Sequence, residues 1–219
     1  MRRTRPAAVP ESRAAYASGW VLSEGATVPP DEERLRSHRH RLTTLRLVLR
    51  PMTESDWPVL LRWNQDPNVL RYWDAGSVEP WTLEKLQAVY RRISTRAFMF
   101  MIVHEGRPVG ECWLQQLNLP DVQQRLRGRE ARRIDLSIGE PGLWGRGLGT
   151  EAIGALVELG FQDAGTDAIV ACHVAEDNPR SRRAFEKNGF VELGPADPAG
   201  GSRPSHHLVL TREKWMERS

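Results

Sequence analysis

The sequence predicts a mixed α/β (α+β) fold, and three patterns in its second half carry that prediction. Alternate residues are apolar over 134–138, which is the period of two that a half-buried strand shows. After the glycine-rich stretch 143–150, Leu-Trp-Gly-Arg-Gly-Leu-Gly-Thr, apolar residues recur at spacings of three and four over 151–164 and predict a helix. A further apolar run over 169–174 predicts a buried strand.

The first half of the chain continues this alternation of strands and helices. Residues 45–50 alternate apolar and polar side chains up to Pro51 and predict the first strand. Thr53 or Ser55 is placed to cap the helix that follows, because a hydroxyl oxygen accepts a hydrogen bond from a free amide at a helix start. Thr82 predicts the start of a second helix in the same way.

The remaining elements complete the pattern. Runs 98–104 and 109–117 predict a hairpin across a Glu-Gly-Arg-Pro turn, since glycine and proline favour turns. The polar stretch 118–133 leads into the strand before the glycine-rich loop. A short helix over 182–188 and a last strand over 205–211 end the predicted order.

Composition is that of an ordinary globular protein. The length of 219 residues suits one domain with an extension, since domains commonly contain about 100–200 residues. Hydrophobic residues make up 40% of the sequence and charged residues 27%, so the chain can bury a core. No apolar run approaches the roughly 18 residues that cross a bilayer. The net charge of +3 is small, so neither a nucleic acid nor a membrane is expected as a partner.

Residues 1–41 are predicted to form an arginine- and proline-rich extension outside a domain that covers 42–219. The first fifty residues contain ten arginines against five acidic residues, and 1–41 shows no clear periodicity. Arg2 and Arg3 suggest an export signal, but no apolar segment follows them. The extension is interpreted as a solvated tail or as an arm that packs on a partner subunit. We therefore expect a monomer or a homodimer.

The two cysteines, Cys112 and Cys172, lie in separate apolar strand patterns. That arrangement supports neither a disulfide framework nor a zinc site, and no metal ion is expected. Buried free thiols are the simpler interpretation. They suit a reducing cytoplasm, which is the expected location.

The loop 143–150 predicts a site for an anionic group. Gly145, Gly147 and Gly149 lack Cβ atoms, so a ligand can approach the backbone, and glycine permits a positive φ where the chain turns. The helix that follows presents free amides and the positive end of its dipole, which attract phosphate. The loop lacks the Gly-Lys-Ser/Thr ending of a P-loop, and its glycine spacing differs from that of a dinucleotide-binding fold.

Two motifs resemble those of the GNAT superfamily of N-acetyltransferases. The family's coenzyme A loop is Q/R-x-x-G-x-G/A, and Gly147 and Gly149 match its glycines. Trp144 replaces the usual Gln or Arg, as it does in the branch that includes ribosomal-protein and antibiotic acetyltransferases. The run 178–190 resembles the family's closing segment, N-x-x-S/A-x-x-x-Y/F-E-K-x-G-F. The resemblance covers residues 42–215.

This resemblance implies a GNAT fold, in which a central mixed, mostly antiparallel sheet splays apart around an acyl-CoA site and is flanked by helices. It implies acetyl-CoA as the cofactor, with the coenzyme's pyrophosphate held by the loop. The implied cofactor-binding residues are Leu136, Ser137, Ile138, Trp144, Gly145, Arg146, Gly147, Leu148, Gly149, Thr150, Asn178, Ser181 and Phe185.

The implied reaction is direct attack of an amine on the acetyl thioester, for which the amine must lose a proton. Asp135 matches an aspartate of the aminoglycoside 6′-N-acetyltransferases and is the candidate base, although it can also be a carboxylate that pairs only with Arg133. Glu111, on the preceding strand, is the second catalytic candidate. Phe185 occupies the position of the family's frequent tyrosine acid, so water or the backbone environment is expected to protonate the CoA thiolate.

The expected acceptor is a small-molecule amine, most specifically the 6′-amine of a polycationic aminoglycoside. The resemblance to that group lies in Tyr72-Trp73-Asp74, in the Gly-Glu-Cys-Trp strand at 110–113 and in Ile134-Asp135. Carboxylates and aromatic rings suit a cationic sugar. One departure is a histidine where those enzymes often carry an aspartate for the drug. The implied substrate-binding residues are Tyr72, Trp73, Asp74, Glu79, Trp113, Asp121 and His173.

Three alternative functions share the motifs. Acetyltransferases that modify the N-termini of ribosomal proteins carry the same Trp-Gly-x-Gly loop, and acylases of siderophore hydroxylamines share the broader pattern. A non-catalytic module that binds acyl-CoA through the loop is the third alternative.

Overall fold

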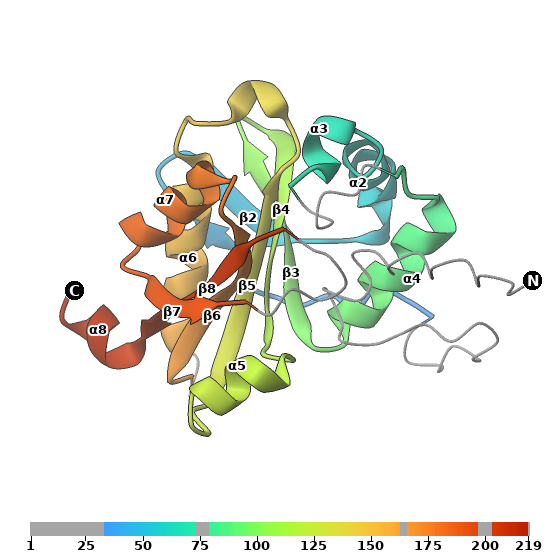
Figure 1. The fold of residues 1–219 in the computed structure, drawn as a ribbon. Coiled ribbons are helices and arrows are strands. Elements are labelled where there is room, and N and C mark those ends of the chain that lie inside the picture. The colour runs from blue at the N-terminus through green and yellow to red at the C-terminus, as the bar shows by residue number, and fades with distance from the viewer. Residues whose placement is uncertain (1–32, 73–78, 163–165, 197–202, 219) are drawn as a thin grey trace, which may run out of the picture.

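The computed structural model describes residues 33–72, 79–162, 166–196 and 203–218. Most of the predicted N-terminal extension lies outside these ranges, and so do two predicted substrate residues, Trp73 and Asp74. Over the described residues the chain forms one eight-stranded sheet with helices on both faces (Figure 1).

The sheet is mixed and mostly antiparallel, as the family resemblance implies. Its strands lie in the order β1-β2-β3-β4-β5-β6-β8-β7, and among the described strands only β5 and β6 pair in parallel. The strands are β1 (Leu42–Thr43), β2 (Leu47–Pro51), β3 (Ala97–His104), β4 (Arg107–Gln116), β5 (Ala131–Ile138), β6 (Ala168–Ala175), β7 (Val191–Pro195) and β8 (Ser205–Thr211).

Helices cover both faces of the sheet (Figure 1). They are η2 (Glu54–Asp56), α2 (Trp57–Trp63), α3 (Pro67–Leu70), α4 (Leu83–Ser94), α5 (Pro120–Arg125), η3 (Pro141–Leu143), α6 (Leu148–Gln162), α7 (Pro179–Lys187) and α8 (Arg212–Met216). The pair α6 and α7 lies on one face, and α2 and α4 lie on the other. None of the helices in the described ranges is both long and apolar enough to cross a bilayer.

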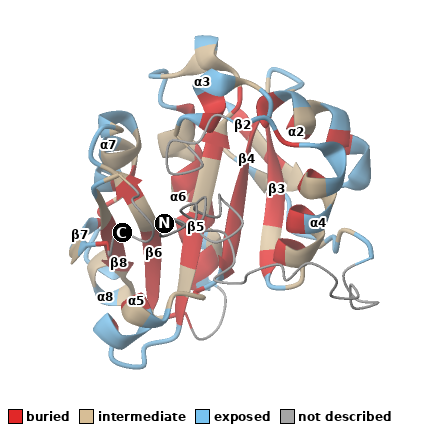
Figure 2. Cartoon of the chain, turned by 45° about the vertical axis from the view of Figure 1, so that its right-hand side comes forward, coloured by how far each residue is buried: buried red, intermediate tan, exposed pale blue. Residues whose placement is uncertain are grey.

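Each face of the sheet has its own hydrophobic core. Ile153 and Leu156 of α6 pack with Phe185 of α7 against one face of the central strands. Trp57 of α2 and Tyr90 of α4 pack against the other face. Burial of one large apolar side chain contributes about 1.5–3 kcal/mol, so both groups of helices are held firmly on the sheet. Figure 2 shows buried residues, in red, along the central strands and on parts of the helices that face the sheet.

Strands β5 and β6 separate over their C-terminal halves. They pair only over 131–133 and 168–170, although both strands continue beyond these residues. A bulge in β6 accompanies the separation, because Cys172 and His173 together face the single β8 residue His207. The sheet is therefore open at the point where the resemblance places the acyl-CoA site.

Local sequence signals determine where several elements begin. The hydroxyl of Thr82 accepts the amide of Lys85 at 3.2 Å and caps α4, as predicted. The side chain of Asn178 accepts the amide of Ser181 at 3.2 Å and caps α7. Residues 105–106 join β3 to β4 with φ of 48° and 75°, the left-handed pair that matches the twist of a two-residue hairpin.

Some elements differ from the sequence predictions. The polar stretch after β4 contains α5, which begins with Pro120 and buries Val122, and the residue after it, Leu126, is buried in the same cluster beside β6 and β8. The edge strand β7 and the terminal helix α8 were not predicted either. The predicted first strand over 45–50 begins at Leu47 and follows the short strand β1.

The described end of the extension, residues 33–41, packs on the domain. The amide of Arg36 donates to Oγ of Ser94 at 2.9 Å. The ring of His38 lies 5.4 Å from that of Phe98 and 4.5 Å from that of Phe100, centre to centre. This segment therefore borders β3 next to the part that pairs with β2. The domain boundary at 42 stays a prediction.

Candidate active site

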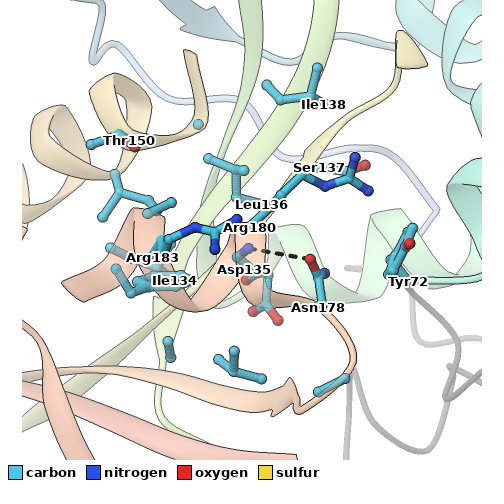
Figure 3. Close-up of a pocket in the computed structure, with 18 of the residues that line it drawn as sticks. Tyr72, Ile134, Asp135, Leu136, Ser137, Ile138, Thr150, Asn178, Arg180 and Arg183 are labelled. Carbon is cyan, nitrogen blue, oxygen red and sulfur yellow. Dashed lines mark hydrogen bonds between the residues drawn. The ribbon is translucent and has the colours of Figure 1, made fainter. Parts of the chain in front are cut away.

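A cleft opens where β5 and β6 diverge. Its volume is about 380 Å³, and residues of β5, β6, the loop 143–150 and the first turns of α6 and α7 line it. Figure 3 shows β5 residues from Ile134 to Ile138, Thr150 at the start of α6, and Asn178 and Arg183 from the α7 segment around this space.

The glycine-rich loop forms part of the cleft wall. Gly145 and Gly147 have φ of 77° and 81°, which other residues adopt only with strain. A Cβ atom on Gly145 would meet no atom within 4 Å, and one on Gly147 would meet only Nη2 of Arg46, at 3.4 Å. The backbone thus presents an open surface in front of the first turn of α6. A phosphate group fits this cradle, because free amides and the helix dipole point toward it.

Side chains hold the loop from the outside. Arg46 donates from Nη1 to the carbonyl of Arg146 at 2.9 Å and from Nε to Oε2 of Glu151 at 2.7 Å. The hydroxyl of Thr44 donates to Oε1 of Glu151 at 2.5 Å. Burial alone would raise the pKa of Glu151, but these donors outweigh burial and hold that pKa below its usual range. Trp144 donates from Nε1 to a backbone carbonyl at the end of β5, at 2.7 Å.

Helix α2 is tied to the start of the same loop. The indole of Trp63 lies against Gly139, where an added Cβ atom would come within 2.2 Å of the ring. Nε1 of Trp63 donates to Oε1 of Glu140 at 2.9 Å, and Arg62 forms an ion pair with the same carboxylate. Glycine at 139 is therefore required by the close approach of the indole.

The α7 wall makes the cleft electropositive. Arg180, Arg183 and Lys187 line the cleft and are spaced three and four residues apart, so they share one helix face. Among the described lining residues six are basic and one is acidic. A ligand with several phosphates suits such a wall, since opposite charges attract more strongly where water is partly excluded.

Arg180 contacts aromatic rings from two different segments that line the cleft. Its guanidinium carbon lies 4.5 Å from the ring centre of Trp144 and 5.3 Å from that of Tyr72. The two rings lie 5.9 Å apart, edge to face. Such cation–π contacts contribute about 0.5–1 kcal/mol each at exposed sites. A predicted substrate residue, Tyr72, and a predicted cofactor residue, Trp144, therefore meet at this arginine.

Asp135 lies on the β5 wall, and its carboxylate already accepts several hydrogen bonds. Arg133 donates from Nε to Oδ2 at 2.9 Å and from Nη2 to Oδ1 at 2.5 Å, and Gln115 donates to Oδ2 at 2.7 Å. Burial disfavours the charged guanidinium, but Asp135 outweighs burial and raises the pKa of Arg133. A carboxylate has about four acceptor positions, so these donors leave one, on Oδ1, for a ligand.

His173 occupies the β6 bulge with a φ of 53°, which is uncommon for a residue with a ring side chain. It lines the cleft, and its ring lies 4.9 Å from that of His207, centre to centre. Burial, together with His207 and Arg133, lowers the pKa of His173 to about 4, so its imidazole is neutral at physiological pH. Burial raises the pKa of the neighbouring Cys172 thiol to about 12, so the thiol is not a nucleophile.

Three of the predicted catalytic and substrate-binding residues in the described ranges do not line the cleft. Glu111 is buried, and its Oε1 accepts the hydroxyl of Tyr90 at 2.6 Å. Glu79 is exposed, and Asp121 lies on α5 with Oδ2 3.6 Å from Nε2 of His207. Their catalytic or substrate-binding roles stay predictions.

Most predicted cofactor residues do meet in the cleft, together with the predicted substrate residues Tyr72, Trp113 and His173. Arg146 is outside the lining, and its carbonyl binds Arg46. No group of three or more His, Cys, Asp or Glu side chains within the described ranges is arranged to hold a metal ion. The cofactor residues that line the cleft are Leu136, Ser137, Ile138, Trp144, Gly145, Gly147, Leu148, Gly149, Thr150, Asn178, Ser181 and Phe185.

Sequence analysis did not identify the basic residues of α7 as part of the site. The spacing of Arg180, Arg183 and Lys187 after a helix cap is the signal that predicts one basic face. Gln115, the second donor to Asp135, gave no such signal, because its position depends on the pairing of β4 with β5.

Comparison with known families identifies the fold. The family described as acetyltransferase (GNAT) domain matches residues 46–191, which is more than half of the chain. The chain belongs to the GNAT acetyltransferases. As a GNAT N-acetyltransferase it uses acetyl-CoA as acyl donor, and the glycine cradle and the basic wall of the cleft fit that coenzyme.

Several relatives of this GNAT enzyme modify aminoglycosides. The aminoglycoside N(6′)-acetyltransferase type 1 of Klebsiella pneumoniae is 28% identical over 185 residues, which cover 77% of this chain and 85% of that protein. The crystal structure of aminoglycoside acetyltransferase AAC(6′)-Ib with coenzyme A aligns with a TM-score of 0.67 at 27% identity, over 79% of this chain and 99% of that one. Spermidine N-acetyltransferase of Vibrio cholerae, solved with CoA and spermine, has the same fold, with a TM-score of 0.63 at 18% identity over 79% and 99% of the two chains.

Proposed function

We propose that this GNAT enzyme transfers the acetyl group of acetyl-CoA to the 6′-amine of an aminoglycoside, a reaction that confers resistance to the antibiotic. The position of Asp135 carries the proposal, because it is the one acidic residue among the described residues that line the cleft. Similarity to aminoglycoside acetyltransferases over most of the chain supports the choice of acceptor.

On the cofactor side, the loop 143–150 and the first turn of α6 hold the pyrophosphate of acetyl-CoA. The positive-φ glycines leave the backbone accessible there, and Arg183 and Lys187 supply charge for a further phosphate. Bound acetyl-CoA supplies the activated acyl group. The β5 edge beyond Arg133, which is not paired with β6, offers backbone amides to the thioester oxygen, where negative charge develops.

On the acceptor side, Asp135 receives the reacting amine. The remaining acceptor position on Oδ1 binds an N–H of that amine, directly or through one water, and so directs the nitrogen lone pair. An amine attacks only when it is neutral, so its additional proton must leave first. Phe185 has no ionisable group, so water protonates the departing thiolate.

The acceptor site extends from Tyr72 and Trp113 to His173, all three of which line the cleft. We include Trp73, Asp74, Glu79 and Asp121 as further acceptor residues and Glu111 as the second catalytic candidate, on the strength of the sequence resemblance. Residues 42–219 form the acetyltransferase domain in this proposal, and 1–41 form the extension.

Thiol release from acetyl-CoA by the purified protein tests the proposed acceptor. Kanamycin, tobramycin and amikacin offer a free 6′-amine, and aminoglycosides with a 6′-hydroxyl group are the matched controls. We expect turnover with the first group and none with the second. Turnover of N-terminal peptides or hydroxylamines, with none of the drugs, would overturn the acceptor. Absence of turnover with every acceptor would contradict the catalytic role.

A further inference from the structure

The two partners of the Arg133–Asp135 ion pair differ in their access to the cleft. The side chain of Asp135 is 16% exposed, whereas that of Arg133 is only 4% exposed. Nη1 of Arg133 also donates to Oδ1 of Asn118 at 3.1 Å. The guanidinium is therefore fixed within the protein, and the carboxylate is the partner with access to solvent.

This arrangement fixes the orientation of the carboxylate. The planar guanidinium forms a two-point contact that sets both the distance and the plane of the carboxylate group. Gln115 adds a third hydrogen bond from the neighbouring strand β4. Asp135 cannot rotate without breaking these contacts, so its remaining acceptor position keeps one direction.

The same arrangement offsets the charge of the carboxylate. An ammonium ion that approaches Asp135 meets an ion pair with little net charge, so attraction for the charged form of the acceptor is weak. A proton on Asp135 would remove the carboxylate charge that pairs with the buried guanidinium of Arg133, which would keep its hydrogen bond with Asn118. Asp135 therefore orients the amine, and the amine's proton passes to water.

We propose that Arg133 is a positioning and specificity-determining residue, which aims Asp135 at the acceptor amine and offsets its charge so that the cleft favours the neutral, reactive amine. The proposal rests on the proposed function of Asp135. In the transfer step the amine nitrogen bonds to the acetyl carbon, and the carbon–sulfur bond breaks with its electron pair on sulfur. The proton of the nitrogen goes to water, and the thiolate takes a proton from water.

Two substitutions separate charge from geometry. Arg133→Gln removes the positive charge that offsets the carboxylate of Asp135, so the KM for kanamycin should fall at least about fivefold. The kcat should fall at least about tenfold, because the acceptor amine is then held as an ammonium ion. Arg133→Lys keeps the charge but loses the two-point contact, so kcat should fall while KM stays within about twofold. Arg132→Gln is the matched control, since Arg132 lies outside the cleft with its guanidinium carbon 5.4 Å from the Phe98 ring centre.

Calorimetric titration with kanamycin in the presence of CoA measures the affinity for the acceptor without any turnover. Arg133→Gln should bind kanamycin at least about fivefold more tightly than the wild type or Arg133→Lys, and a 6′-hydroxyl analogue should show no gain. Equal kanamycin affinity in the three proteins would overturn the proposal. If the wild type acetylates no aminoglycoside, the proposed function fails, and the same titration with the amine that the wild type does acetylate decides the role of Arg133.

Thermal denaturation establishes whether each variant is folded. If Arg133→Gln does not fold, Arg133→Lys decides alone. A lowered kcat with an unchanged KM supports a positioning role, and wild-type values of both constants overturn it.

Discussion

The two sides of the cleft are built from different parts of the polypeptide. The cofactor side consists of backbone held in special conformations, at Gly145, Gly147 and the start of α6, beside a basic helix face. The proposed acceptor side consists of side chains that bind one another, with Asp135 paired to Arg133 and a neutral His173 nearby. Coenzyme binding should therefore depend mainly on backbone shape, whereas acceptor binding should depend on a few side-chain atoms.

The largest expected effect tests the backbone side. Gly147→Val should weaken CoA binding at least about a hundredfold, because a branched residue is strained at a φ of 81° and its Cβ atom comes within 3.4 Å of Nη2 of Arg46, which holds the loop. Gly142→Ala is the control, since a Cβ atom there meets nothing within 4 Å. Calorimetry with CoA measures both variants, and unaltered affinity of Gly147→Val would refute the assignment of the loop.

The next largest effect tests the acceptor side of the cleft, which consists of side chains. Asp135→Asn should lower turnover at least about a hundredfold while CoA affinity stays within about twofold, because the group that accepts the amine's hydrogen bond loses its charge. Glu111→Gln should lower turnover less than about tenfold, since that carboxylate is buried against Tyr90 outside the cleft lining. Steady-state kinetics of both variants decide between the two carboxylates, and a larger loss in Glu111→Gln would reverse their roles.

A control is needed because Asp135→Asn also removes the carboxylate charge that pairs with Arg133. The double variant Arg133→Gln, Asp135→Asn removes both charges, so it should recover thermal stability relative to Asp135→Asn without recovering turnover. Recovery of turnover in the double variant would show that the loss had been structural.

The smallest effect concerns side chains on the cofactor side, which otherwise consists mainly of backbone. These side chains support the turn before α7. His206 binds Glu176 and Glu192 through its two ring nitrogens, each at 2.8 Å. The hydrogen bond with Glu176 raises the pKa of His206 against the opposing effect of burial, and Glu192 adds to the rise. The protonated ring is therefore the form that stabilises the fold.

The sign of the pH dependence follows from this raised pKa. The stabilisation is fully present below the unfolded-state pKa of about 6.5 and disappears as pH rises through the higher folded-state value. His206→Gln should lower Tm by about 1–3 °C at pH 6, given that the contacts are partly exposed, and the difference should shrink at alkaline pH. Melting curves across this range test it, and a constant difference would show that the ring charge is not involved.

The sequence allowed much of the cofactor side to be predicted, because its signals are local. The glycines of the loop, the Asn178 cap and the helix after the loop each depend on neighbouring residues, and the structure places them together in one cleft. Possible pairing of Arg133 with Asp135 was also visible, since residues two apart on a strand face the same side.

The rest of the acceptor side depends on contacts between distant segments. Gln115 reaches Asp135 only because β4 and β5 pair in one register, and Tyr90 reaches Glu111 across 21 residues of sequence. Helix α5 was missed for another reason. The helix itself buries one apolar residue, Val122, and Leu126 follows directly after it, which is too few for a clear helical period.

The contact of Trp63 with Gly139 and Glu140 links the position of helix α2 to the position of the loop 143–150. Helix α2 packs with α4 on one face of the sheet, and Glu140 stands just before the loop 143–150, so a displacement of either strains the same indole and carboxylate. If bound coenzyme changes the protein's affinity for the acceptor by some factor, thermodynamic linkage requires that the bound acceptor changes the protein's affinity for coenzyme by the same factor. One tryptophan therefore ties the packing of α2 to the start of the loop 143–150.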